Sequence, residues 1–227
     1  MKFVTVSGPP SSGKTAVLSH VVRSLMKSGI HPGIVKFDCL STDDDKLFQR
    51  LDIPVRVGLS GNMCPDHFFV SNIEDCIQWG KNQSLDILLS ESAGLCNRCS
   101  PHIAGVLAVC VIDNLMGVNT PKKIGPMLRY ADLVVITRGD IVSQAEREVF
   151  AFKVRQANPK AKILQVNGLT GQGAGELASM FTEAAAVDSL EGGKLRFSMP
   201  AALCSYCLGE TKIGNDFQLG NIKKIKT

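Results

Sequence analysis

The sequence has few aromatic residues: one Trp, two Tyr and ten Phe among 227 residues. Its core must therefore be filled mainly by aliphatic side chains. The sequence also lacks a strong charge of either sign, since 25 basic residues stand against 21 acidic ones and the net charge is +4. That balance is too mild to indicate nucleic acid binding. Lys223, Lys224 and Lys226 gather near the end, and we interpret them as a solvated tail.

Long apolar runs are missing as well. No stretch reaches the roughly 20 apolar residues that a membrane-spanning helix needs. The first residues, MKFVTVSG, turn polar too quickly for a secretory signal. These absences predict a cytoplasmic protein that binds no membrane. In that compartment the eight cysteines are expected to remain reduced rather than to form disulfides.

Short apolar runs alternate with longer amphipathic stretches along most of the chain. Apolar strands that alternate with helices are typical of a parallel sheet covered by helices on both faces. The sequence therefore predicts an α/β fold with a doubly wound, mostly parallel sheet. We expect strands at 2–7, 33–38, 85–92, 105–113, 131–140 and 161–167, and helices at 14–29, 66–80, 121–130, 143–157 and 174–187.

The stretch GPPSSGKT matches the phosphate-loop pattern G-x-x-x-x-G-K-[ST], directly after an expected strand and before an expected helix. In this context backbone N–H groups and the helix N-terminus bind phosphate oxygens, lysine pairs with the outer phosphates, and threonine contacts Mg²⁺. The alternative is a Gly-rich turn that binds nothing. The predicted phosphate-binding residues are Gly8, Pro9, Pro10, Ser11, Ser12, Gly13, Lys14 and Thr15.

The composition changes after the last expected helix. From about residue 190 the chain is Gly-rich, polar and patterned over short distances. We therefore predict a nucleotide-binding domain at 1–190 and a small Cys-containing module at 191–227, with a possible β-hairpin.

Two acidic residues end expected strands, at the edge of the sheet where such folds bind ligands. Asp38 ends one strand and is a candidate for Mg²⁺ or the attacking water. Glu91 ends another and is a candidate for the water shell of the metal. With Lys14, these are the predicted catalytic residues. The alternative for each is a solvated strand-end carboxylate or a helix cap.

Two further strand ends carry candidates for contacts to the base. Thr137, Arg138 and Asp140 lie in TRGD, where a carboxylate can accept hydrogen bonds from N1 and N2 of guanine. Asn167 and Gly168 open the VNGLTGQG segment, whose backbone N–H groups can reach the carbonyl of the base. Adenine lacks those donors, so Asp140 favours GTP, with ATP as the alternative.

Together these residues resemble the P-loop GTPases of the UreG, HypB and CobW group, over about residues 1–187. The resemblance rests on GPPSSGKT, on KFDCLSTDDD (36–45), on Glu91 to Gly94 and on TRGD, which departs from N-K-x-D at Thr137 and Arg138. It implies a slow GTPase that delivers nickel or another metal to a client metalloenzyme or its assembly factors.

The segment VGLSGNMCPDHFF (57–69) resembles the Cys-Pro-His segment of UreG-like proteins, with one residue inserted before the histidine. The resemblance implies that Cys64 and His67 bind nickel or zinc between the two subunits of a homodimer. The alternative is a buried cysteine and a surface histidine.

Two C-x-x-C pairs have no general counterpart in that family: Cys96 with Cys99, and Cys204 with Cys207. They favour a four-cysteine zinc or iron–sulfur site, if the C-terminal module folds back to the first pair. Two separate sites, a redox dithiol and incidental reduced thiols are the alternatives.

These features predict a GTP- and Mg²⁺-dependent switch whose nucleotide state is coupled to metal or metallocofactor delivery. Two other functions remain open. A small-molecule kinase would share the phosphate loop but should show an acceptor pocket and an Arg-rich lid. The other alternative is an iron–sulfur or zinc module that binds nucleotide without significant turnover.

Overall fold

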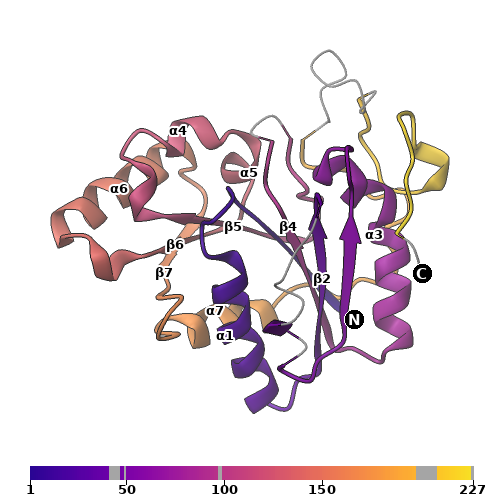
Figure 1. Cartoon of the computed structure of the whole chain (residues 1–227), viewed down its shortest axis with the longest axis horizontal. Helices are drawn as coiled ribbons and strands as arrows, with labels where there is room; N and C mark the ends of the chain where they lie inside the picture. The colour runs from indigo at the N-terminus through magenta and orange to yellow at the C-terminus, as the bar shows by residue number, and fades with distance from the viewer. Residues whose placement is uncertain (41–46, 49, 97–98, 198–208, 226–227) are drawn as a thin grey trace.

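The computed structural model describes all residues except 41–46, 49, 97–98, 198–208 and 226–227. Its centre is a seven-stranded sheet in the order β3-β2-β4-β1-β5-β6-β7, and every pair of neighbouring strands is parallel. Figure 1 shows helices on both sides of this sheet. The strands are β1 (Lys2–Ser7), β2 (Pro32–Asp38), β3 (Val55–Leu59), β4 (Ile87–Ser92), β5 (Leu107–Asp113), β6 (Leu133–Thr137) and β7 (Lys162–Gln165).

The predicted doubly wound fold is confirmed, because side chains that alternate along each strand build cores on opposite faces. On one face, Val4 and Val6 pack with α1 and α7. On the other, Phe3 packs with α3, and Cys110 and Ile112 of β5 pack with α4 to α6. The helices are α1 (Lys14–Lys27), α3 (Pro65–Asn82), α4 (Pro121–Ile124), α5 (Pro126–Arg129), α6 (Gln144–Ala157) and α7 (Ala174–Thr182).

The structure differs from the expected elements in three places. β3 was not predicted; it is an edge strand of five residues, of which only Gly58 is buried. The helix expected at 121–130 is divided into α4 and α5, because Gly125 between them has φ of 71° and leaves the helical region. The helix expected at 174–187 ends at Thr182.

The described residues of 190–225 form a C-terminal segment, whose last part lies along α3, as the yellow trace in Figure 1 shows. Leu190, Leu195 and Ile213 are buried in the core cluster of α3, and Ile225 packs against it. Among the described residues of this segment there is no hairpin, only isolated bridges such as Lys194 to Lys212 and a short 3-10 helix. The described portion therefore shares the core of the main domain.

Within the described part of the chain, no helix is long and apolar enough to cross a membrane.

Candidate functional site

The phosphate loop connects β1 to α1, as predicted from its sequence. Gly8 has φ of 147°, and a Cβ built there would lie 2.0 Å from the carbonyl oxygen of Val111, so only glycine fits. The Nζ atom of Lys14 donates to the carbonyl oxygens of Gly8 and Pro9, at 2.9 Å each. Lys14 is only 6% exposed, and this burial lowers its pKa. The ammonium group of Lys14 is therefore held by the backbone of the phosphate loop itself.

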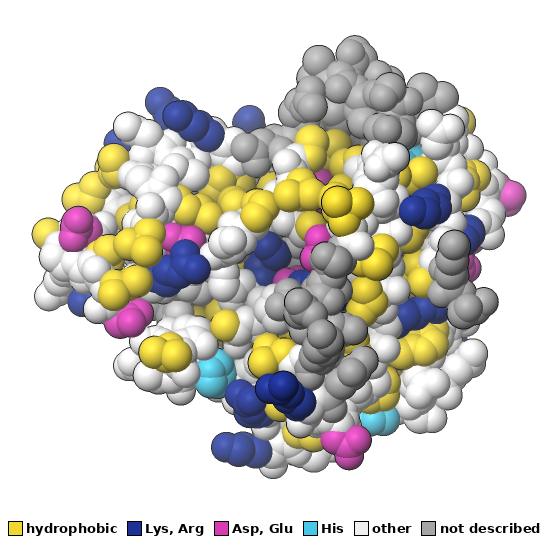
Figure 2. Space-filling model, viewed as in Figure 1, with side chains coloured by type: hydrophobic (Ala, Val, Ile, Leu, Met, Phe, Trp, Pro, Cys, Tyr) yellow, Lys and Arg dark blue, Asp and Glu magenta, His cyan; other side chains and the backbone are white. Residues whose placement is uncertain are grey.

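Three charged side chains from neighbouring strands meet beside Thr15. The Thr15 hydroxyl donates to Oε1 of Glu91 at 2.9 Å, and Lys36 donates to the same oxygen at 2.9 Å. Both Lys36 and Glu91 are almost fully buried. With Asp38 they line a cavity of about 510 Å³ above the phosphate loop. Figure 2 shows basic and acidic side chains together in the hollow near the middle of this face.

Lys36 was missed by the sequence reasoning, although one signal was present. It is the one charged residue before the last position of β2, whose other residues up to Phe37 are uncharged and buried. A buried lysine inside a strand requires a partner, and its register neighbour on β4 is Glu91.

The oxygens in this cavity fit a hard divalent cation. The hydroxyl of Thr15 and the carboxylates of Asp38 and Glu91 are the ligand types that Mg²⁺ prefers. Oε2 of Glu91 is buried and has no hydrogen-bond partner among the described residues. Oδ1 of Asp38 accepts a hydrogen bond from the backbone N–H of Cys39 at 2.8 Å, which orients the carboxylate.

Thr137 and Arg138, predicted to contact the base, are directed toward the phosphate loop. The Thr137 hydroxyl donates to the carbonyl oxygen of Ser12 at 2.8 Å. Arg138 donates to the carbonyl oxygen of Ser11 at 2.8 Å and to Oδ2 of Asp113 at 2.9 Å. These two side chains attach the end of β6 to the loop.

The other base candidates line a second cavity. Asp140 and Asn167 face a space of about 370 Å³ together with Gly139, Arg147 and Gln165. Oδ1 of Asn167 is used locally, because it accepts from the N–H groups of residues 169 and 170. Gly168 does not line this cavity, and its carbonyl oxygen lies 3.2 Å from Nε2 of His20.

The segment after β4 touches the phosphate loop. Gly94 has φ of 65°, and a Cβ built there would lie 1.8 Å from the carbonyl oxygen of Gly8. The backbones of the two segments are therefore in direct contact. A movement of either one must be transmitted to the other.

The structure pairs the thiols differently from the two sequence patterns. Cys64 precedes α3, and its thiol lies close enough to that of Cys99, which follows β4, to interact with it. That interaction and burial raise the pKa of the Cys64 thiol. Cys96 is half-exposed, while Cys99 is 1% exposed. Cys204 and Cys207 lie outside the described residues.

His67 is fully buried and is directed toward the C-terminal segment rather than toward the thiols. Its Nε2 lies 2.7 Å from the carbonyl oxygen of Asn221, and its Nδ1 lies 3.6 Å from Oε1 of Glu210. Its neighbour Asp66 is buried with no hydrogen-bond partner for its carboxylate among the described residues, and burial raises its pKa to about 7. In the described portion of the chain, no group of three or more His, Cys, Asp and Glu side chains could hold a metal ion.

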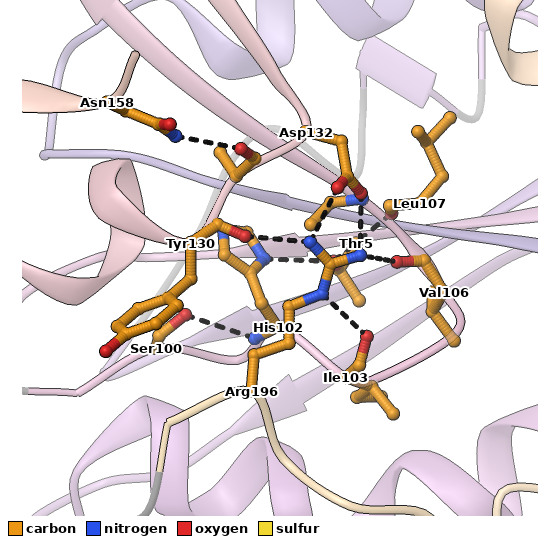
Figure 3. A network of polar contacts seen from close by, with 12 residues as sticks. Thr5, Ser100, His102, Ile103, Val106, Leu107, Tyr130, Asp132, Asn158 and Arg196 are labelled. Carbon is orange, nitrogen blue, oxygen red and sulfur yellow. Dashed lines mark hydrogen bonds and ion pairs between the residues drawn. The ribbon is translucent and has the colours of Figure 1, made fainter. Parts of the chain in front are cut away.

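A polar network anchors the loop that carries Cys99 (Figure 3). The backbone N–H of Arg196 donates to the carbonyl oxygen of His102. The guanidinium of Arg196 binds both carboxylate oxygens of Asp132 and the carbonyl oxygens of Ile103, Val106 and Tyr130. The C-terminal segment therefore fixes the loop through contacts that no local sequence pattern indicated.

His102 is fully buried between β1 and α5. Its Nε2 lies 2.9 Å from the carbonyl oxygen of Met127, which can only accept, so Nε2 carries the proton. Its Nδ1 then accepts from the hydroxyl of Thr5 at 3.1 Å. Burial lowers the pKa of His102 from 6.5 to about 4.

This pKa predicts a pH-dependent stability. The neutral ring is favoured in the folded protein, so its contribution is complete above pH 6.5 and is lost as pH falls toward 4. The expected loss is about 3 kcal/mol of unfolding free energy. Urea titrations between pH 7 and 4 should show it in the wild type and not in His102→Gln. The exposed His31 is the control, and equal pH profiles for His102→Gln and His31→Gln would contradict the prediction.

Comparisons with known proteins agree with this geometry. Residues 2–165 match the nucleotide-binding domain of the CobW/HypB/UreG family. An uncharacterized protein of Methanocaldococcus jannaschii is 49% identical over 225 residues, which cover 99% of this chain and 96% of that protein. The urease accessory protein UreG of Edwardsiella ictaluri is 30% identical over 193 residues, covering 78% of this chain and 91% of that protein.

Solved structures share the fold at lower identity. HypB from Helicobacter pylori, in complex with nickel, has a TM-score of 0.65 at 16% identity and covers 83% of this chain and 91% of that one. The hydrogenase maturation factor HypB from Archaeoglobus fulgidus has a TM-score of 0.64 at 22% identity, covering 81% and 89%. The chain therefore belongs to the CobW/HypB/UreG family, and its residues 2–165 form the nucleotide-binding domain of that family.

Proposed function

We propose that this protein is a GTP-dependent switch that delivers a metal ion, nickel or zinc, or a metallocofactor, to a client metalloenzyme or its assembly factors. One observation carries the proposal: the thiol of Cys64 in the Cys-Pro segment lies within interaction distance of the thiol of Cys99. Cys99 lies on the segment that follows Glu91 and the Gly94 contact with the phosphate loop. A thiol pair of this kind suits Ni²⁺ or Zn²⁺.

In this function the cavity above the phosphate loop holds the terminal phosphates. Lys14 pairs with the outer phosphates, and Thr15, Asp38 and Glu91 supply the oxygens for Mg²⁺. The bound cation would neutralise charge on the phosphates during a slow hydrolysis. Asp140, at the second cavity, would accept from N1 and N2 of guanine, which is the basis for GTP over ATP.

Nucleotide and metal are coupled through the segment that starts at Glu91. When the terminal phosphate is bound, this segment is held against the phosphate loop through Gly94. Loss of that phosphate releases the segment and moves Cys99 relative to Cys64. The metal affinity then changes with nucleotide state, and by linkage the metal changes nucleotide affinity by the same factor.

Two thiolates cannot complete a tetrahedral site. The remaining ligands are proposed to be Cys204 and Cys207 of the same chain, or the same pair from a second copy in a homodimer. His67 would have to leave Asn221 and Glu210 before it could join them.

The proposal predicts the effect of removing either thiol. Cys64→Ala and Cys99→Ala should each lower the affinity for Ni²⁺ or Zn²⁺ by about a hundredfold or more, because even outer-shell partners of metal ligands contribute ten- to hundredfold. Cys76→Ala is the control, since Cys76 is buried within α3. The measurement is a competition titration on anaerobic protein, with GDP and with a non-hydrolysable GTP analogue. An affinity that is the same with both nucleotides would refute the coupling.

A further inference from the structure

Lys36 is a buried cation in a strand whose other buried residues are uncharged. β2 reads PGIVKFD, and its residues are buried up to Phe37. Lys36 is 4% exposed. Burying an ammonium group is strongly unfavourable without a partner of opposite charge. Its side chain lies on the same face of the sheet as α1, since Val35 and Phe37 on either side of it pack with α3.

The partners of Lys36 are the oxygens of the phosphate cavity. Its Nζ lies 2.9 Å from Oε1 of Glu91 and 3.5 Å from the hydroxyl of Thr15. These are two of the oxygens that fit Mg²⁺. The ammonium therefore contacts atoms that a metal-bound nucleotide would also use.

Two buried ammonium groups lie in this cavity. Lys14 and Lys36 line it together with the buried carboxylate of Glu91 and the partly exposed carboxylate of Asp38. Arg138 at the same cavity already has an aspartate partner. The pKa of Lys14 reflects this arrangement: burial lowers it most, Glu91 raises it, and Lys36 lowers it further. Two buried ammonium groups that line one cavity favour an anion with several oxygens, such as a polyphosphate.

We propose that Lys36 is a second phosphate-binding cation, which turns from Glu91 to the terminal phosphate when the nucleotide enters with its metal ion. This inference rests on the proposed nucleotide switch and adds a residue to it. The alternative role for Lys36 is purely structural, namely to neutralise Glu91. The two roles differ in one respect: neutralising Glu91 is unnecessary once the carboxylate is removed, whereas a phosphate contact is still needed.

The test is a mutant cycle that uses this difference. The variants are Lys36→Met, Glu91→Gln and the double variant, with Lys162→Met as control because Lys162 is in an exposed pair with Glu176. The affinities for GDP and for a non-hydrolysable GTP analogue are measured with Mg²⁺ and with a chelator. Circular dichroism establishes that each variant is folded, and the double variant avoids a buried unpaired carboxylate.

The expected result is that the double variant binds the triphosphate about ten- to hundredfold more weakly than Glu91→Gln in the presence of the chelator, the size of a charge-assisted contact. The loss for GDP should be smaller. Equal triphosphate affinities of the double variant and Glu91→Gln would overturn the role of Lys36 while leaving the nucleotide switch intact. A wild-type protein that binds neither nucleotide would overturn the switch and this proposal together.

Discussion

Replacing Gly94 with alanine is expected to weaken nucleotide binding by about a hundredfold, because a displacement of about 1 Å in a binding site can have an effect of that size. The new Cβ would lie 1.8 Å from the carbonyl oxygen of Gly8 and 2.7 Å from its carbonyl carbon. Both are backbone atoms of the phosphate loop, so no side-chain rotation can relieve the overlap. Either the loop or the segment after β4 must move. Titration with a fluorescent GDP or GTP analogue measures the loss.

Gly105→Ala is the matched control for this prediction. Gly105 lies at the other end of the same segment and has φ of 78°, so alanine there has the same backbone strain. A Cβ at Gly105 would meet no atom within 4 Å. We expect its nucleotide affinity to stay within about threefold of the wild type, since the strain is distant from the phosphate loop. Similar losses in both variants would show that backbone strain, and not contact with Gly8, is responsible.

Replacing Arg196 with methionine is expected to destabilise the protein by about 1–3 kcal/mol, because carbonyl oxygens that it contacts lose their hydrogen-bond donor. The Arg196 side chain is 20% exposed and forms an ion pair with Asp132, whose side chain is 41% exposed. Its removal also leaves the carbonyl oxygens of Ile103, Val106 and Tyr130 without this donor. The free energy of unfolding in urea measures the effect.

Lys224→Met is the control for Arg196→Met. Lys224 also belongs to the C-terminal segment and also pairs with an aspartate, Asp75, but both side chains are more than 40% exposed. An exposed pair contributes only about 0–1 kcal/mol. If both variants lose the same small amount of unfolding free energy, the network in Figure 3 does not anchor the loop that carries Cys99.

Much of the fold could be predicted from local patterns. β1, β2, β4 and β5 are short apolar runs, and α1 repeats apolar residues at helical spacing, so each element is evident in its own sequence. β3 could not be predicted in this way. Its residues are mostly half-buried, and its position follows from pairing with β2 at the edge of the sheet. An edge strand has few local requirements, so its sequence carries a weak signal.

In the candidate site, too, some contacts could not be predicted from local sequence. Sequence spacing paired Cys64 with His67 and Cys96 with Cys99, because residues close in sequence were assumed to act together. In the structure the thiol of Cys64 meets that of Cys99, and His67 lies against Glu210. These contacts depend on how separate segments of the chain pack together. The spacing of residues in the sequence does not predict that packing.

The sequence by itself determined the phosphate loop and the family. The eight residues from Gly8 to Thr15 are contiguous, and their conformation depends on their own glycines and on the strand and helix that flank them. Only the tertiary structure decided that Lys36 faces Glu91 and that Gly94 touches Gly8. The physical reason is that strand order brings residues 55 positions apart within hydrogen-bond distance, and strand order is a property of the whole packed sheet.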